Sequence, residues 1–240
     1  FASWGASPEE ENADINVLNV EGETRKLDIK VVRTKRVLKV DEEAFLPEIP
    51  LFGTLEFRAS LEALPHWLRV VAEAEKQVSA MTTCDPQREE CPSFALKWQS
   101  MRREAMDLPP MKKMKKVNAF INRWPYRLDS DIYGRADYWA TPREFLTLSG
   151  DCEDYAIAKY FALRQLGFEP EALRIVVVMD TIRNLPHAVL VVYESGEAYL
   201  LDNLSDLVLP HTRYMHYQPQ YSVNESYRWM HVRPDAQMKE

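Results

Sequence analysis

Three shortages in the sequence restrict what this protein can be. Only three of the 240 residues are cysteine, and no second Cys or His pair stands at zinc-ligand spacing, so a zinc site is not expected. No segment approaches the roughly 18 apolar residues of a membrane-spanning helix, so we expect no membrane insertion. The first residues, Phe1-Ala2-Ser3-Trp4, lack the charged and apolar regions of a signal peptide. The protein is therefore either cytosolic or has been separated from its signal peptide.

The chain also lacks an excess of positive charge. Its 30 Lys and Arg residues against 37 Asp and Glu give a net charge of −7. Proteins that bind nucleic acid need a basic face to neutralise phosphates, so no nucleic-acid partner is expected. The one basic cluster, four lysines within 112–116, reads as the solvated face of a helix whose other face is apolar.

Hydrophobic residues make up 46% of the chain, enough for one sizeable core with a small appended lobe. Residues 1–14 are polar and are expected to be loose. Apolar residues then alternate over 15–40, with a turn at Glu21-Gly22-Glu23, which predicts a small β-ribbon. Prolines and a glycine at 47–53 indicate a linker. We therefore predict an N-terminal β-like extension over 1–50 and a main domain over 51–240.

The pattern of the main domain predicts helices first and an antiparallel sheet afterwards, which is an α+β order. One helix should begin at Ser149-Gly150-Asp151 and end near Leu166. It is apolar nearly all round, which is typical of a buried helix. The segment 124–149 and the C-terminal part that holds His211, His216 and His231 are expected to be irregular. The other predicted helices cover 56–80, 92–106 and 110–123, and the predicted strands cover 174–179, 187–193 and 198–203.

Two of the cysteines, Cys84 and Cys91, lie in a polar loop that contains proline. Exposed paired cysteines in such a loop indicate a disulfide and an oxidising compartment. Two free thiols are the alternative. In either case Cys152 is the unpaired third cysteine.

Cys152 stands in the first turn of the predicted buried helix. A thiol there feels the positive end of the helix dipole, which favours the reactive thiolate. A lone cysteine is more often a small core residue, so a base must lie near it before a nucleophile is inferred. Trp139, upstream, could line a substrate cleft or donate its indole N–H to an oxyanion, or could simply pack in the core.

His187 and Asp202 can supply that base and its partner. A hairpin turn centred on Ser195-Gly196 pairs Val189 with Asp202, which places Asp202 on the same sheet face as His187 at roughly 5–8 Å. A carboxylate at that place would orient the imidazole and stabilise its protonated form. The alternative is two polar residues at strand ends without a function.

Carboxylates crowd the candidate nucleophile. Asp151, Glu153 and Asp154 flank Cys152, and their negative charge would raise the pKa of the thiol. A hard cation with oxygen ligands would offset them, and Ca²⁺ fits such a set. The Asp-rich segment 129–137, which ends at Asp137, could supply further ligands. The alternative is an acidic first turn that the helix dipole favours in water.

Two blocks of this region resemble the bacterial transglutaminase-like cysteine proteinases. They are Asp137-Tyr138-Trp139-Ala140-Thr141-Pro142 and Gly150-Asp151-Cys152-Glu153-Asp154-Tyr155. His187-Ala188-Val189-Leu190 and Leu201-Asp202-Asn203 are similar to the family's His and Asp blocks. The resemblance covers roughly 110–205. The extension of about 50 residues at the N-terminus and the Cys84–Cys91 loop have no counterpart in it.

The resemblance implies a papain/transglutaminase-like fold with Cys152, His187 and Asp202 in the catalytic positions. It implies a calcium requirement tied to Asp151 and Glu153, to which we add Asp154 and Asp137 as candidate ligands. It further implies a periplasmic protease that cleaves a large surface adhesin near its N-terminus at a small-residue motif such as Ala-Ala. Cleavage would release biofilm cells, and a membrane receptor for cyclic di-GMP would sequester the protease.

Other functions fit the same residues. A transglutaminase that joins Gln to Lys, or a peptidoglycan amidase, would use the same acyl-transfer chemistry. A calcium-binding scaffold that has lost catalysis would keep the fold and the carboxylates alone.

Overall fold

The structure is a computed structural model that describes residues 10–18, 24–32, 49–88 and 90–234. The chain divides into two compact units, residues 1–44 and residues 45–240. In the described ranges, no helix combines the length and the apolar character needed to cross a bilayer.

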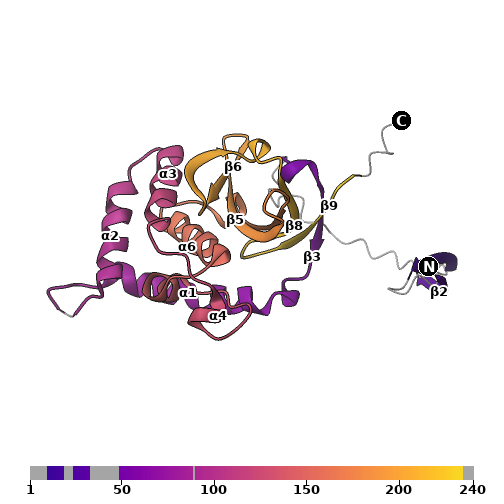
Figure 1. Ribbon diagram of the computed structural model, residues 1–240, viewed down its shortest axis with the longest axis horizontal. Coiled ribbons are helices and arrows are strands. Elements are labelled where there is room, and N and C mark those ends of the chain that lie inside the picture. Colours follow the sequence, from indigo (N-terminus) through magenta and orange to yellow (C-terminus); the bar gives the residue numbers. More distant parts are fainter. Residues whose placement is uncertain (1–9, 19–23, 33–48, 89, 235–240) are drawn as a thin grey trace, which may run out of the picture. The chain divides into compact units, whose positions relative to one another are not determined.

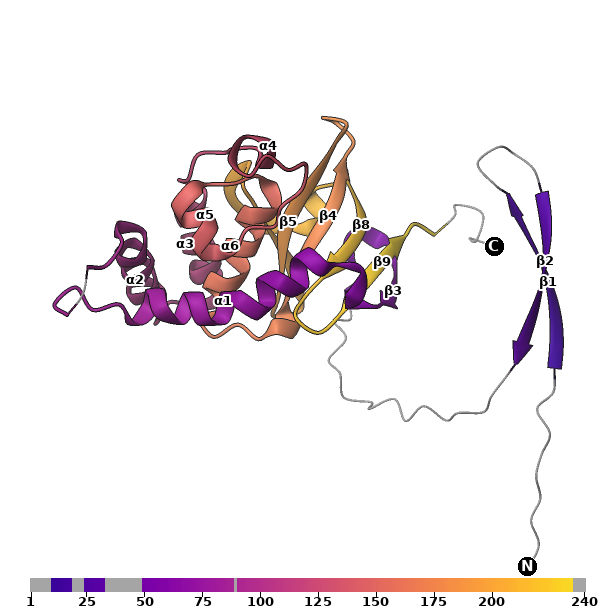
Figure 2. The same ribbon diagram turned by 90° about the horizontal axis from the view of Figure 1, so that it is seen from below.

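The first unit contains an antiparallel pair of strands, β1 (Glu10–Leu18) and β2 (Thr24–Val32), in which Ile15 lies opposite Leu27 (Figure 2). The predicted ribbon is confirmed for these two strands. It starts earlier than expected, because residues 10–14, predicted to be loose, belong to β1. The predicted turn at 21–23 and the apolar run at 37–40 lie outside the described residues.

The second unit packs helices against a seven-stranded antiparallel sheet, so the predicted α+β class is confirmed (Figure 1). The order of strands across the sheet is β3-β9-β8-β4-β5-β6-β7. The helices are α1 (Pro65–Thr83), α2 (Ser93–Ala105), α3 (Pro110–Ile121), α4 (Asp129–Ile132), α5 (Pro142–Leu148) and α6 (Cys152–Arg164). The strands are β3 (Leu55–Ala59), β4 (Leu173–Asp180), β5 (Leu185–Glu194), β6 (Glu197–Asp202), β7 (Ser205–Pro210), β8 (Tyr217–Val223) and β9 (Arg228–Val232).

Helix α6 forms the centre of the core. Every residue from Asp154 to Leu163 is buried, as its apolar sequence predicts. The helix packs on β4, β5 and β6, and Trp67 of α1 stacks edge-on against Tyr160 of α6. The first turn of α6 therefore sits at a rigid place against the sheet.

Three parts of the pattern predicted for the main domain are wrong, and the third is the segment 124–149. The helix expected over 56–80 begins only at Pro65, and residues 55–59 form the edge strand β3, which pairs with β9. The C-terminal part is ordered as β7, β8 and β9. The register of β8 on β4 shifts by one residue, because Gln220 of β8 is the extra residue between Tyr221, opposite Val177, and Pro219, opposite Val178. These strands form through partners that are distant in sequence, so local periodicity does not reveal them.

The segment expected to be irregular contains α4 and α5. A capping box begins α5: Thr141 Oγ1 accepts from the Glu144 backbone N–H at 3.3 Å, and Glu144 Oε2 accepts from the Thr141 N–H at 2.7 Å. With Pro142 in the first turn, the sequence Thr-Pro-Arg-Glu carries the signal for the start of this helix.

Cys84 and Cys91 form a disulfide with their Cα atoms 5.9 Å apart, which confirms that prediction. It closes the loop between α1 and α2, and a loop this short corresponds to a stabilisation of about 2–3 kcal/mol.

Candidate active site and carboxylate cluster

The sequence motif around Cys152 folds as one tight unit. Cys152 is the first residue of α6. A Cβ added to Gly150 would lie 2.0 Å from Asp154 Oδ2, so only glycine leaves room for that carboxylate. The two oxygens of Asp154 accept from the backbone N–H groups of Asp151 at 3.2 Å and Ala140 at 2.6 Å. Asp154 thereby ties the start of α6 to the segment before α5.

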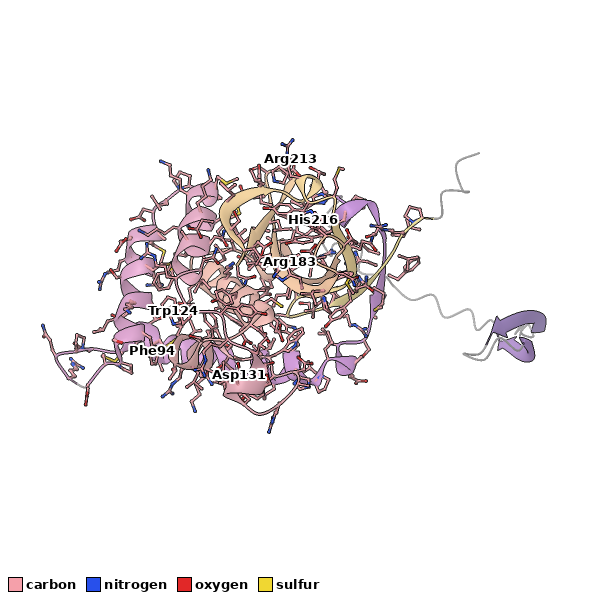
Figure 3. All side chains as sticks on the ribbon, viewed as in Figure 1. Phe94, Trp124, Asp131, Arg183, Arg213 and His216 are labelled. Carbon is pink, nitrogen blue, oxygen red and sulfur yellow. A yellow bond between two sulfur atoms is a disulfide. The ribbon has the colours of Figure 1, made fainter. Side chains whose placement is uncertain are left out.

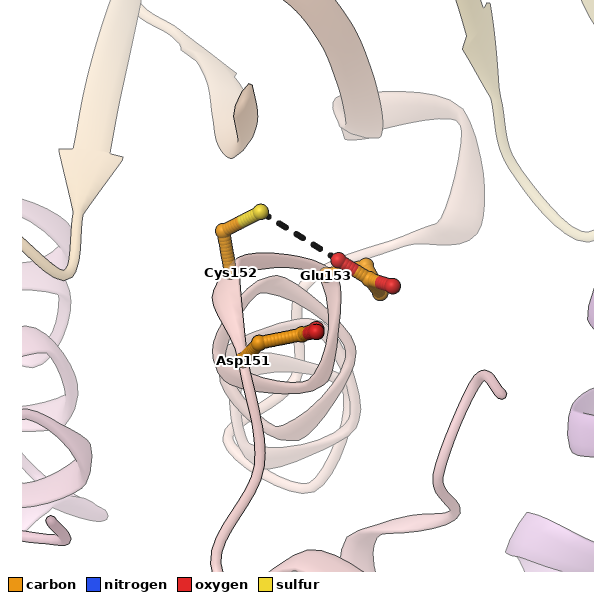
Figure 4. A group of neighbouring side chains, drawn as sticks. All are labelled: Asp151, Cys152 and Glu153. Carbon is orange, nitrogen blue, oxygen red and sulfur yellow. Dashed lines mark hydrogen bonds between the residues drawn. The ribbon is translucent and has the colours of Figure 1, made fainter. Parts of the chain in front are cut away.

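The thiol of Cys152 donates a hydrogen bond to Glu153 Oε2 at 3.2 Å, drawn as the dashed line in Figure 4. Burial raises the pKa of Cys152 well above its usual value, and the charges of Glu153 and Asp151 raise it further. A hydrogen bond from the backbone N–H of Ala188 acts in the opposite direction. The thiol is therefore neutral in this arrangement, and the burial and charges outweigh the helix dipole.

His187 and Asp202 form a buried pair, as the hairpin geometry predicts. His187 Nε2 lies 2.9 Å from Asp202 Oδ1, and the two residues are 5% and 2% exposed. The hairpin register pairs Leu190 with Leu201 and closes at Ser195 and Gly196, both with positive φ. This register is the predicted one, because it continues to place Val189 opposite Asp202.

Asp202 is itself held by three donors. Besides the imidazole, Tyr217 donates its hydroxyl to Oδ2 at 2.7 Å and Leu204 donates its backbone N–H to Oδ1 at 3.0 Å. Burial alone would raise the pKa of Asp202, but the hydrogen bond and charge of His187 and the two further donors hold it below its usual value. The carboxylate is therefore ionised and orients the ring.

The thiol and the imidazole lie on neighbouring elements but are not hydrogen-bonded in the described part of the chain. Helix α6 packs on β5, the strand that carries His187, and the backbone N–H of Ala188, the next residue, lowers the pKa of the thiol. The imidazole uses Nε2 for Asp202, which leaves Nδ1 as the nitrogen that can accept a proton. The base that the sequence predicts near Cys152 is therefore not its hydrogen-bond partner, because the thiol donates to Glu153 instead.

A cluster of carboxylates lies beside the thiol. Two groups of three have ligand atoms within 4.8 Å of one another: Asp129, Asp137 and Glu153 form one, and Asp129, Asp151 and Asp154 form the other. All four candidate ligands named from the sequence are thus brought together. Asp129 joins the two groups.

Asp129 is the residue that the ligand prediction lacked. It is 2% exposed, and its Oδ2 accepts from the Tyr138 backbone N–H at 2.5 Å. The only signal in the sequence is the acidic composition of segment 129–137, and this composition does not predict which of its aspartates is buried. Asp131, labelled in Figure 3, is exposed on α4.

The electrostatics of this cluster fit a hard cation. Burial, together with the neighbouring negative charges, raises the pKa of Asp151 to about 8 and that of Asp129 to about 6. Buried oxygens Oδ1 of Asp129 and Oδ1 of Asp151 have no hydrogen-bond partner among the described residues. Carboxylate oxygens left unpaired at such spacing are the ligands that Ca²⁺ prefers.

Trp139 is a core residue. It is 5% exposed and stacks edge-on with Trp67 at 6.2 Å, while its carbonyl accepts from Arg69 at 2.5 Å. Of the two readings of the sequence, packing is the one that these contacts support.

Comparison with known proteins now decides the family. Residues 71–237 match the family model described as bacterial transglutaminase-like cysteine proteinase BTLCP. The chain belongs to this family. The bacterial transglutaminase-like cysteine proteinases are thiol proteases, so the chain is a cysteine proteinase by family.

Solved structures of Legionella pneumophila LapG are similar to the chain. One is 29% identical with a TM-score of 0.55, and the match covers 68% of this chain and 90% of that one. A calcium-bound LapG is 30% identical with a TM-score of 0.55, over 65% and 86% of the two chains. An EGTA-treated LapG is 29% identical with a TM-score of 0.54, over 65% and 84%. Among curated proteins, none matches the chain.

Proposed function

We propose that this cysteine proteinase is a calcium-dependent endopeptidase in which Cys152 is the nucleophile, His187 the general base and Asp202 the group that orients the base. The observation that carries the proposal is the buried His187–Asp202 pair, whose histidine lies on β5, the strand against which α6 packs. A cysteine at a helix start beside an oriented imidazole is the arrangement that acyl transfer requires.

The reaction follows from these positions. Nδ1 of His187 accepts the thiol proton, and the sulfur attacks the carbonyl carbon of the scissile peptide bond. The resulting imidazolium, stabilised by Asp202, protonates the leaving amine as the C–N bond breaks and a thioester to Cys152 remains. The imidazole then takes a proton from water, which hydrolyses the thioester and restores the thiol. The backbone N–H of Ala188 and the start of α6 favour the thiolate during this cycle.

The carboxylates Asp129, Asp137, Asp151, Glu153 and Asp154 would hold the calcium ion. A bound calcium ion would neutralise negative charge that otherwise opposes formation of the thiolate. Glu153 belongs both to this cluster and to the hydrogen bond with Cys152, so the position of its side chain decides whether the thiol is free.

For the biological role we propose cleavage of a large surface adhesin near its N-terminus in the periplasm, which releases the adhesin and disperses biofilm. A membrane receptor for cyclic di-GMP would sequester the protease through its periplasmic domain. Membership of the family supports this proposal, and the Cys84–Cys91 disulfide supports an oxidising compartment.

The test is incubation with the N-terminal segment of a large adhesin encoded nearby, with calcium or with EGTA, followed by mass spectrometry of the products. We expect cleavage only with calcium, and none by Cys152→Ala. Asp131→Asn, which removes an exposed carboxylate of α4 outside the cluster, is the matched control and should cleave normally. Cleavage by Cys152→Ala, or full cleavage in EGTA, would contradict the proposal, and incorporation of an amine instead of hydrolysis would indicate a transglutaminase.

The hydrogen bond from Cys152 to Glu153 favours a second candidate, a calcium-binding scaffold without turnover. Iodoacetamide separates the two. If the protein is a protease, iodoacetamide with calcium present should alkylate Cys152 faster than it alkylates free cysteine. An alkylation rate near that of free cysteine would favour the scaffold.

A further inference from the structure

The segment that precedes α4 exposes apolar side chains that the fold does not require. Pro125, Tyr126, Arg127 and Leu128 are exposed in succession, and Tyr126 and Leu128 keep 52% and 49% of their surface in solvent. Single exposed apolar side chains are common on proteins, so exposure alone assigns no function. The position of these two side chains relative to the candidate active site decides their role.

Backbone contacts place Tyr126 beside the entry to the nucleophile helix. Tyr126 forms a parallel β-bridge with Gly150, and the backbone N–H of Arg127 donates to the Gly150 carbonyl at 2.9 Å. Bridged segments lie about 5 Å apart, and Gly150 precedes Cys152, the first residue of α6, by only two positions. The exposed segment therefore runs alongside the chain that leads into Cys152.

A ring contact places the side chain of Tyr126 at the same point. Its ring stacks on the ring of Tyr155, with centroids 6.3 Å apart and planes inclined by 19°. Tyr155 follows Cys152 by three residues on α6, so the side chains of Cys152 and Tyr155 are neighbours on the helix surface. Tyr126 therefore lies over the helix turn that begins with the nucleophile.

Tyr155 gives Tyr126 a fixed support. Its side chain is 3% exposed, its hydroxyl donates to the Trp124 carbonyl, and its ring meets Phe145 edge-on at 4.8 Å. One face of the Tyr126 ring rests on this support, and about half of the residue remains open to solvent. A ring held in this way can bind a further apolar group with little loss of its own conformational freedom.

Leu128 continues this apolar surface toward the carboxylate cluster. Its backbone is extended, with φ −74° and ψ 147°. Residues two apart in an extended chain project to the same side, so Leu128 follows Tyr126. Asp129, the next residue, turns inward and belongs to the cluster. The apolar surface thus extends from the start of α6 to a candidate calcium ligand.

We propose that Tyr126 and Leu128 form a substrate-binding subsite that takes an apolar side chain of the peptide substrate close to the scissile bond. The inference rests on the proposed function and names the chemistry of the substrate that the site selects. A peptide whose carbonyl reaches the Cys152 sulfur spans about 3.3 Å per residue, so its next few residues pass the flanks of α6. An apolar side chain that covers Tyr126 and Leu128 removes apolar surface from water, whereas a charged one would lose hydration without gaining a partner.

The first experiment tests the contact itself by photo-cross-linking. The photoreactive residue p-benzoylphenylalanine replaces Tyr126 in the Cys152→Ala protein, which binds substrate without turning it over. After irradiation with calcium and the adhesin segment, mass spectrometry should place the cross-link within about four residues of the scissile bond. The matched control carries the same probe at Phe57, which is 54% exposed on β3 and separated from β5 by three strands, and should give no cross-link there.

The second experiment tests selectivity with two fluorogenic peptides. One is built on the mapped cleavage site, and the other has glycine in place of the residue that the probe reaches. On the first peptide, Tyr126→Ala should raise KM about tenfold with kcat within about twofold, because it removes binding that the ground state and the transition state share. On the glycine peptide, Tyr126→Ala should change KM less than about twofold. Tyr126→Phe and Phe57→Ala should match the wild type on both peptides.

Two results would overturn the proposal: a bound adhesin segment with no cross-link near the scissile bond, or an equal rise of KM on the two peptides. If Tyr126→Ala does not fold, Leu128→Ala should raise KM on the first peptide alone, and wild-type values there would overturn the proposal. If the wild type cleaves nothing, the proposed function fails. A cross-link to the adhesin segment from position 126 and not from position 57 would then still support the binding surface, and none from either would overturn it.

Discussion

Removal of calcium should make the stability of the protein fall as the pH rises. The folded chain raises the pKa of Asp151 from 3.8 to about 8 and that of Asp129 from 3.8 to about 6, by burial and by mutual repulsion. Between the unfolded pKa of 3.8 and the folded pKa values of about 6 and about 8, the calcium-free folded state therefore binds more protons than the unfolded state. Its stability is fully present below the unfolded pKa near 3.8 and is lost as the pH rises through about 6 and then about 8.

The size of this loss follows from the shifts. A shift of about four pKa units at a shielded group corresponds to roughly 5 kcal/mol. Asp151 is partly exposed, and solvent screening reduces its share to about 2 kcal/mol. Asp129 is buried but coupled to Asp151, so the two do not add. We expect the calcium-free protein to lose about 2–4 kcal/mol of unfolding free energy between pH 5 and pH 8.

Urea unfolding of the Cys152→Ser variant measures this directly, in calcium and in EGTA across that pH range. Subtracting the unfolding free energy in EGTA from that in calcium at each pH removes the contribution of every group that does not interact with the ion. Stabilisation by calcium should be small at pH 5 and grow toward pH 8, because protons compete with the ion for the same oxygens. Asp131→Asn should show the same stabilisation by calcium as the parent at each pH. Asp129→Asn should make the stabilisation by calcium smaller and less dependent on pH. A stabilisation by calcium that is absent, or independent of pH, would refute the reasoning.

Three further predictions follow from single contacts. Asp202→Asn should lower kcat by about 10³–10⁴ with little change in Tm, because the imidazole loses its orienting carboxylate; a loss under tenfold in a peptide-cleavage assay would contradict this. Gly150→Ala should destabilise the fold by about 3 kcal/mol in urea unfolding, because the added Cβ meets the buried Asp154 carboxylate, and a change below about 0.5 kcal/mol would show that the carboxylate can move. Replacing both Cys84 and Cys91 by serine should lower the stability by about 2–3 kcal/mol and leave kcat unchanged, so a loss of activity in the folded variant would place the loop in the site.

The sequence predicts those parts of the site that depend on local structure. Cys152 follows from a helix start and a cap, and the His187–Asp202 pair follows from a hairpin whose turn, Ser195-Gly196, sets its register. The family resemblance adds the roles. Strands β3, β8 and β9 escaped prediction because each pairs with a segment far away in the chain.

Burial of individual polar residues is the other part that the sequence cannot give. Asp129 and Asp131 are both acidic residues of one short helix, yet only Asp129 turns inward, because the N–H of Tyr138 binds it there. Lys159 and Arg164 are the charged residues of α6 past its first turn; Arg164 pairs with Glu225, whereas Lys159 has no partner among the described residues. The hydrogen bond from Cys152 to Glu153 depends on one side-chain rotamer, which no sequence pattern encodes.

The central claim is that the sulfur of Cys152 carries the acyl group, and intact-mass spectrometry of acid-quenched reactions measures this most directly. With calcium and the adhesin segment, the protein should gain the mass of the N-terminal product, and peptide mapping should place that mass on Cys152. EGTA should abolish the adduct. Cleavage with no adduct in calcium on any quenching time scale, or an adduct on another residue, would contradict the account.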